Sequence, residues 1–142
     1  SEEFEICELV SKTIKKYENK KIIFKETNKI IFTGRKNLIR RSLNNFIDNS
    51  IKYGENIYIN LKRNSNNITI NIEDDGPGIS SKEHENVFKP FYKIDKSRGD
   101  SKSSVGLGMS IASDIIQSHG GNIKLEKSSL LGGLKVKIFL PL

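Results

Sequence analysis

The segment of residues 38–54 constrains the fold of this chain most strongly, because it has the pattern of a long amphipathic helix. At about 100° per residue, its apolar side chains share one broad arc that is wide enough to face a protein core. These side chains are Leu38, Ile39, Leu43, Phe46, Ile47 and Ile51. Gly54 follows as the expected C-terminal cap. The segment therefore predicts a helix with one face on the core.

One flank of this predicted helix carries polar side chains spaced four, four and three residues apart, namely Arg41, Asn45, Asn49 and Lys52. An amide oxygen can ligate a hard cation, an amide N–H can donate to an oxyanion, and a lysine can neutralise phosphate. Such a stripe is equally typical of a solvated helix flank. By itself it leaves both interpretations open.

Composition limits the class of protein. The chain has 142 residues, of which 35% are hydrophobic and 29% charged, as expected for one globular domain with a real core. No apolar run approaches the roughly 20 residues that cross a bilayer. The single cysteine, Cys7, excludes an internal disulfide, and the scattered cysteine and histidines offer no zinc set. The net charge of +7 is spread along the chain among acids, which disfavours a nucleic-acid binder.

Hydrophobic periodicity predicts the remaining helices and strands. Alternating apolar residues on both sides of a polar turn at residues 64–67 indicate an antiparallel hairpin. In chain order we expect a helix over 3–18, short β-rich runs over 20–26 and 29–32 joined by a turn, hairpin strands over 56–63 and 68–73, a helical turn over 80–87, a helix from 109 to the glycines at 120–121, and strands over 122–127 and 134–140.

The turn after the hairpin reads Asp74-Asp75-Gly76-Pro77-Gly78-Ile79. Two glycines around a proline allow a tight bend and the close approach of a planar ligand. A carboxylate at the end of the strand, Asp74, could accept a hydrogen bond from an exocyclic amine. The alternative is a strong turn with no further role.

Residues 93–105 are rich in Ser, Lys and Gly and show no periodicity, which is typical of a lid or a disordered segment. This segment carries Lys96, Arg98 and Lys102. It ends at Gly106-Leu107-Gly108-Met109, where a helix opens. Free N–H groups at a helix start favour anion binding. The glycines complete neither a Walker A loop nor a dinucleotide fingerprint.

Four segments, in this order, resemble the sequence boxes of the catalytic ATP-binding domain of sensor histidine kinases, a group that shares its fold with gyrase, Hsp90 and MutL. They are Asn45 to Tyr53 (N box), Asp74 to Ile79 (G1 box), Phe88-Lys89-Pro90-Phe91-Tyr92 (F box) and Gly106 to Ile111 (G2 box), followed by Ser118-His119-Gly120-Gly121. The segment Gly132-Gly133-Leu134 resembles the corresponding segment of EnvZ-type osmosensor kinases.

The resemblance implies an α/β fold over the whole of residues 1–142. We expect a two-layer sandwich, the Bergerat ATP-binding fold. Its mixed, mostly antiparallel sheet would have about five strands, with about three helices on one face. A flexible ATP lid would cover residues 92–105.

The resemblance also implies roles for individual residues. Asp74 would bind the adenine amino group, with Ile79 and Met109 lining the base pocket. Asn45 and Asn49 would hold Mg²⁺ and phosphate oxygens, and Asn45 and Arg98 would be the catalytic residues. The full nucleotide-binding set would be Asn45, Asn49, Lys52, Tyr53, Asp74, Gly76, Gly78, Ile79, Lys96, Arg98, Gly106, Leu107, Gly108 and Met109.

The implied activity is transfer of the γ-phosphoryl group of Mg-ATP to a histidine on a separate dimerisation domain, with a response regulator as further partner and no nucleic acid. Neither His84 nor His119 lies in an acceptor motif, so we expect an excised domain without its own acceptor or sensor. The parent protein would be a membrane-anchored homodimer in the bacterial inner membrane. The domain itself would be cytoplasmic and monomeric.

Three alternatives stay open. ATPases of the gyrase, Hsp90 and MutL kind, and anti-sigma serine kinases, favour Glu at the position of Asn45, where it serves as general base in the ATPases. An amide cannot take that proton. The third alternative is a catalytically silent nucleotide-binding module that acts only in interactions.

Overall fold

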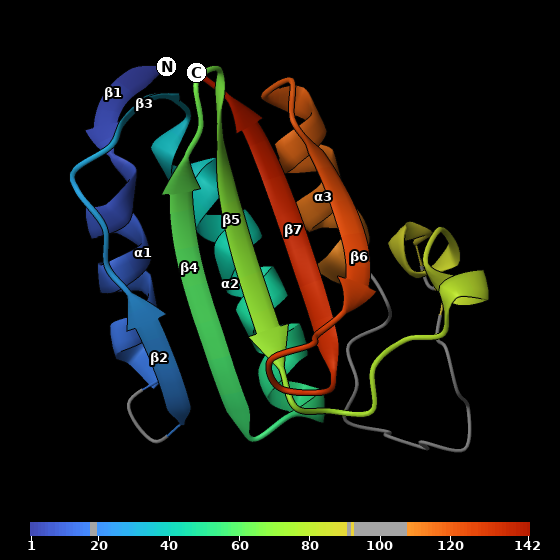
Figure 1. Ribbon diagram of the computed structural model, residues 1–142. Helices are drawn as coiled ribbons and strands as arrows, with labels where there is room; N and C mark the ends of the chain where they lie inside the picture. The colour runs from blue at the N-terminus through green and yellow to red at the C-terminus, as the bar shows by residue number, and fades with distance from the viewer. Residues whose placement is uncertain (18–19, 91, 93–107) are drawn as a thin grey trace.

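The computed structural model describes residues 1–17, 20–90, 92 and 108–142, and within them five strands pair into one sheet (Figure 1). Their order across the sheet is β2 (Lys21–Lys25), β4 (Asn56–Arg63), β5 (Asn67–Asp74), β7 (Leu134–Pro141) and β6 (Asn122–Lys127). The β2–β4 pair is parallel and the other pairs are antiparallel. The mixed, mostly antiparallel sheet expected from the resemblance is confirmed.

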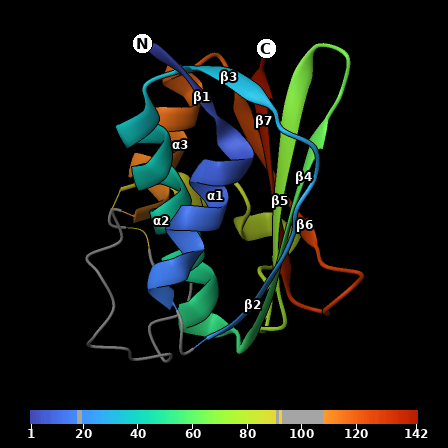
Figure 2. The same cartoon turned by 90° about the vertical axis from the view of Figure 1, so that its left-hand side faces the viewer.

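Helices of the described segments lie on one face of this sheet, as Figure 2 shows. They are α1 (Ile6–Ile14), α2 (Lys36–Tyr53) and α3 (Gly108–Ser118). Short 3₁₀ helices, η1 (Lys15–Tyr17), η2 (Ser81–Glu83) and η3 (Asn86–Phe88), complete the helical elements of these segments. No described helix is both long and apolar enough to span a membrane. The two-layer α/β sandwich is confirmed.

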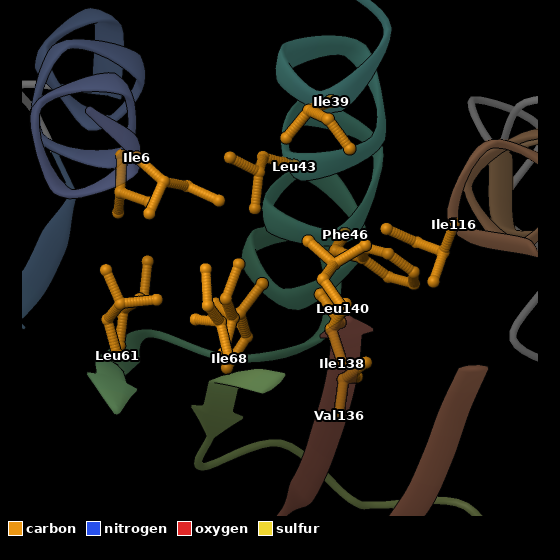
Figure 3. Packing of buried hydrophobic residues seen from close by; sticks show 14 of the residues in the cluster. Ile6, Ile39, Leu43, Phe46, Leu61, Ile68, Ile116, Val136, Ile138 and Leu140 are labelled. Carbon is orange, nitrogen blue, oxygen red and sulfur yellow. The ribbon is translucent and has the colours of Figure 1, made fainter. Parts of the chain in front are cut away.

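The central helix α2 packs its predicted apolar face on the middle of the sheet. Ile39, Phe46 and Ile47 have no exposed surface, and Leu43 is 2% exposed. Figure 3 shows Leu43 and Phe46 near side chains of the sheet such as Ile68 and Leu140. Burying one such side chain stabilises the fold by about 1.5–3 kcal/mol. The helical period therefore identified the part of α2 that holds the two layers together.

The N-terminal residues differ from the prediction. Glu2–Glu5 form strand β1, which pairs with β3 (Ile31–Gly34) in a separate two-stranded sheet, and the helix begins only at Ile6. The Glu5 carboxylate explains the change, because it accepts hydrogen bonds from the N–H groups of Cys7 (2.7 Å) and Glu8 (3.1 Å) and so caps the helix. The prediction of a helix over 3–18 is wrong for residues 3–5.

The two short β-rich runs also belong to different sheets. The first run forms β2 at the edge of the five-stranded sheet, whereas the second forms β3 and pairs with β1. Phe4 and Phe32 meet edge to face between β1 and β3, with ring centroids 5.7 Å apart. The chain between β2 and β3 therefore connects two sheets.

Gly54 ends α2 as predicted, but with a different backbone conformation. It is extended (φ −124°, ψ 163°), whereas a glycine cap of the expected kind is left-handed. Its N–H still donates to the Ser50 carbonyl at 2.8 Å. A Cβ here would lie 3.0 Å from the Asp74 Cβ and 3.0 Å from the Asp75 Oδ1. Gly54 thus permits close packing of the helix end on the turn after β5.

Candidate functional site

The candidate site centres on Asp74, a carboxylate buried at the end of β5 with 3% of its surface exposed. Its Oδ1 accepts hydrogen bonds from the N–H groups of Gly76 (2.9 Å) and Leu134 (3.2 Å). Burial raises the pKa of Asp74, and these two backbone hydrogen bonds oppose the rise. Both bonds end on Oδ1, so Oδ2 has no such bond from the described residues.

A second polar group with unused capacity lies beside this carboxylate. Ser50 of α2 is 1% exposed, and its Oγ has no hydrogen-bond partner in the described part of the chain. The hydroxyl is close enough to lower the pKa of Asp74 slightly, although it meets no atom at hydrogen-bond geometry. An unpaired buried hydroxyl costs about 1–3 kcal/mol, so a ligand or water that pairs with it would be stabilising.

Glycines around Asp74 leave no room for side chains. A Cβ on Gly76 would lie 2.6 Å from the Tyr53 carbonyl oxygen, and one on Gly133 would lie 2.4 Å from both the Asp74 carbonyl oxygen and its Oδ1. Gly78 has a φ of 75°, which favours glycine. Three segments therefore meet at the strand ends that lie lowest in Figure 1: the end of α2, the turn after β5 and the connection before β7.

The neighbouring carboxylate, Asp75, has a different role. Its Oδ1 accepts from the N–H groups of Glu55 (2.8 Å) and Asn56 (3.1 Å), and its Oδ2 accepts from the Asn56 Nδ2 at 2.7 Å. These hydrogen bonds lower the pKa of Asp75. Asp75 thus ties the start of β4 to the turn, a structural role that sequence analysis did not assign.

The carboxamides of α2 lie on the flank next to α3. Ser42, on the same side of the helix, donates from its Oγ to the Ala112 carbonyl of α3 at 3.2 Å. Asn45 and Asn49 are half-buried, and neither side chain makes a hydrogen bond to any described residue. Carboxamide oxygens without partners are suitable ligands for Mg²⁺, so the residues present fit this ion.

The C-terminal end of the same flank is more exposed. Lys52 is exposed, and its Nζ lies 5.3 Å from the centroid of the Tyr53 ring. Tyr53 is half-buried. A cation and a ring therefore stand at the end of α2 that adjoins the Asp74 turn.

Apolar residues predicted to line a base pocket pack on the rim of the core. Ile79 and Met109 are half-buried against the core cluster. His84 is half-buried, and its Nε2 lies 2.9 Å from the Ile79 carbonyl oxygen. Nothing near His84 in the sequence suggested that it fixes Ile79.

The predicted F box is described except for Phe91, which lies outside the described residues. Phe88 and Tyr92 pack against the core, and the Tyr92 hydroxyl donates to the Glu83 carboxylate. The rest of the predicted lid, with Lys96 and Arg98, and the glycine segment at Gly106 and Leu107 lie outside the described residues. Gly108 and Met109 begin α3, one residue earlier than predicted.

Comparison with known proteins identifies the family. The family described as "Histidine kinase-, DNA gyrase B-, and HSP90-like ATPase" matches residues 34–142. The chain belongs to this family.

Relatives within this ATPase family include sensor kinases. The chain is 38% identical to the sensor histidine kinase CpxA of Escherichia coli strain K12 over 110 residues, which are 77% of this chain and 24% of that protein. It is 42% identical over 96 residues to the signal transduction histidine-protein kinase ArlS of Staphylococcus aureus, covering 66% of this chain and 21% of ArlS. The chain thus spans about a quarter of the length of these relatives.

Solved structures agree on the fold. The ATP-binding domain of PrrB from Mycobacterium tuberculosis superimposes with a TM-score of 0.81 over 98% of this chain and 95% of that one, at 23% sequence identity. The resemblance to histidine kinase ATP-binding domains is therefore confirmed for fold and family. Membership of the EnvZ-type subgroup stays a prediction.

Proposed function

We propose that this domain binds Mg-ATP and transfers the γ-phosphoryl group to a histidine on a separate dimerisation domain of a two-component sensor kinase, which in turn serves a response regulator. One observation carries the proposal. A buried carboxylate, Asp74, accepts its backbone hydrogen bonds from described residues on Oδ1 alone, and it lies beside a helix flank whose carboxamides, Asn45 and Asn49, bond to no described residue, in a chain whose relatives include sensor histidine kinases.

In this proposal Asp74 recognises the adenine amino group. The fixed position of Oδ1 supports this role, because the described backbone donors leave Oδ2 to accept from an exocyclic amine. Gly76 and Gly78 would let the backbone approach the base closely. Ile79 and Met109 would contact its faces.

The triphosphate would extend along α2 toward α3. The amide oxygens of Asn45 and Asn49 would hold Mg²⁺, which neutralises charge on the phosphates when bound. Lys52, Tyr53, Lys96 and the backbone of Gly106, Leu107 and Gly108 would contact phosphate oxygens. Arg98 would approach the γ-phosphate.

The proposed chemistry depends on position and charge. The acceptor histidine nitrogen attacks the γ-phosphorus, the bond to the β–γ bridging oxygen breaks, and ADP leaves. Asn45 stands where a hydrolytic relative would have a general base, and an amide cannot accept a proton from water. Transfer to an external nucleophile is therefore favoured over ATP hydrolysis and over the serine-kinase alternative.

The remainder of the parent protein is also part of the proposal. Since the chain spans about a quarter of CpxA, we expect the dimerisation and sensor segments elsewhere in the parent. The parent would be a membrane-anchored homodimer of the bacterial inner membrane, with this domain cytoplasmic. The isolated domain would be monomeric, which sedimentation analysis can check.

Calorimetric titration with ATP, with and without Mg²⁺, tests the binding step. Asn49→Asp should weaken ATP binding, most of all without Mg²⁺, because it adds a negative charge beside the triphosphate. Asn37→Asp is the matched control, since Asn37 is an exposed asparagine in the first turn of the same helix. Equal losses in both variants would contradict the assignment of Asn49.

Addition of the parent's purified dimerisation domain tests the transfer step. Phosphohistidine should form on that domain and not on the isolated 142-residue chain. Arg98→Ala should largely preserve ATP binding but slow the transfer. An unchanged transfer rate would overturn the role of Arg98, and phosphorylation of the isolated chain would overturn the absence of an acceptor.

A further inference from the structure

The connection between β6 and β7, residues 128–133, folds onto the end of β5 around one buried hydroxyl. Ser128 has no exposed surface. Its Oγ accepts a hydrogen bond from the Leu131 N–H at 2.9 Å, its N–H donates to the Gly133 carbonyl at 2.7 Å, and its carbonyl accepts from the Gly132 N–H at 2.8 Å. One residue therefore sets the path of the whole connection.

The same hydroxyl fastens this connection to β5. Ser128 Oγ donates to Glu73 Oε1 at 2.9 Å, and Glu73 is only 6% exposed. Glu73 lies directly before Asp74 and pairs across the sheet with Tyr58 and Lys135. A carboxylate this well buried is costly unless it accepts hydrogen bonds, so its bond to Ser128 is a strong constraint on the connection.

The connection then delivers two N–H donors to Asp74. Gly133 N–H donates to the Asp74 carbonyl at 3.0 Å, and Leu134 N–H donates to Oδ1 at 3.2 Å. A Cβ on Gly133 would lie 2.6 Å from the Gly76 nitrogen, so the connection packs directly against the backbone of the turn after β5. A shift of the connection would move both donors, and with them the carboxylate.

We propose that Ser128 and Glu73 are positioning residues for nucleotide-base recognition, which hold the connection so that Leu134 fixes Oδ1 of Asp74 and Oδ2 is left for the amino group of adenine. This inference rests on the proposed function of Asp74. It assigns specificity to a pair of residues that does not touch the nucleotide. A role in packing alone would weaken binding of every nucleotide to the same extent.

Comparing ATP with inosine triphosphate separates these roles, because inosine carries a carbonyl oxygen in place of the amino group. Ser128→Ala should weaken ATP binding by about three- to tenfold, the value of one net hydrogen bond, while the affinity for inosine triphosphate stays the same. Ser129→Ala is the matched control, since Ser129 is the exposed neighbour in the same connection. It should leave both affinities unchanged.

Loss of stability needs its own control. Thr13→Ala removes a buried hydroxyl that bonds to the Leu9 carbonyl of α1 at 2.7 Å, away from Asp74. It should lower the melting temperature without changing the ratio of ATP to inosine triphosphate affinity. If Ser128→Ala does not fold, Glu73→Gln and Glu73→Leu give the test from β5. Glutamine keeps an acceptor and should keep the ratio, whereas leucine removes the acceptor and should reduce it.

The outcomes distinguish the two proposals. If the wild type shows no preference for ATP, or if Asp74→Asn keeps the preference, the proposed role of Asp74 is wrong. If Asp74→Asn abolishes the preference but Ser128→Ala and Glu73→Leu keep it, the positioning role is overturned and the site assignment stands. In the Asp74→Asn background, Ser128→Ala should have no further effect on the ratio, and an additional loss would also contradict the positioning role.

Discussion

At each end of α2 a side chain accepts hydrogen bonds from backbone N–H groups. The two ends differ in which polar groups stay without a partner among the described residues. At the Lys36 end, the Arg35 N–H donates to His119 Nε2 at 3.0 Å, so Nδ1 carries the proton and donates to the Ile115 carbonyl at 2.8 Å. The ring also lies against Phe32, with centroids 6.3 Å apart. Both ring nitrogens are therefore satisfied within the fold.

At the Tyr53 end, the Asp74 carboxylate likewise accepts hydrogen bonds from backbone N–H groups, but not every polar group there is paired within the described residues. Ser50 Oγ beside it is buried and has no hydrogen-bond partner among the described residues, and burial raises the pKa of the carboxyl. Polar capacity left unused in a buried position is a cost to stability that a bound ligand can offset. From this comparison we expect the fully paired end to serve the fold and the incompletely paired end to serve the binding proposed above.

The largest expected effect is that of Gly133→Ala at the Tyr53 end. The added Cβ would meet backbone atoms of Asp74 and Gly76 that cannot move aside, so we expect a loss of about 3 kcal/mol in unfolding free energy, at the upper end for overpacking, and loss of ATP binding. Gly132→Ala is the control, because a Cβ there meets nothing within 4 Å and costs only the strain of φ 90°, about 1–2 kcal/mol. Urea denaturation measures both, and equal losses would contradict the close packing of Gly133.

Asp74→Asn should separate binding from stability. ATP affinity should fall by about 10- to 100-fold, the value of a hydrogen bond to a charged acceptor. The raised pKa means that the ionised carboxyl is less favourable in the fold than in the unfolded chain, so its cost appears as the pH rises through the folded pKa. The variant without nucleotide should therefore be at least as stable as the wild type at neutral pH. Calorimetric titration and thermal melting check the two parts, and intact ATP affinity would refute the adenine assignment.

His119→Ala tests the opposite end. The variant loses both ring hydrogen bonds and the contact with Phe32, so we expect about 2 kcal/mol less unfolding free energy and an unchanged affinity for ATP. Denaturation and nucleotide titration measure the two quantities. A large fall in ATP affinity in the folded variant would break the distinction between the two ends of α2.

The smallest expected effect concerns Asp75 and depends on pH. Hydrogen bonds from Asn56 and Glu55 hold its pKa below the ordinary value of 3.8, so its stabilising contribution is present above that pH and is lost as the pH falls through the lowered pKa. Asp75→Asn should therefore be less stable than the wild type at pH 7, with a difference that shrinks toward pH 2. Melting curves across this range check the sign of the stability difference between variant and wild type. At pH 7 this sign should be opposite to that for Asp74→Asn.

Sequence patterns predicted the elements whose folding depends on near neighbours. The apolar arc of α2, the β4–β5 hairpin and the glycine turn after Asp74 follow from spacing within one segment, and the structure confirms each. The chemistry of the residues alone suggests a binding role for Asp74, for the polar stripe of α2 and for the glycines before α3, each beside a purely structural interpretation. The carboxamides Asn45 and Asn49 needed the resemblance to be preferred over a solvated flank.

Features that depend on distant contacts escaped the sequence analysis. Glu-rich residues 2–5 form a strand because β3 lies beside them and Glu5 caps the next helix. His119 acts on Arg35 across 84 residues, and Ser128 acts on Glu73 across 55. Gly133 matters because Asp74 lies against it, which no local pattern of glycines encodes.

NMR signals of the backbone amides during an ATP titration test most directly the central claim that the nucleotide binds at the Asp74 end of α2. Titration of Mg-ATP into the ¹⁵N-labelled chain should shift the amides of Gly76, Gly78 and Leu134 progressively to saturation and leave those of Arg35 and His119 in place. Saturable shifts at Arg35 and His119 with none in the Asp74 turn would contradict the account.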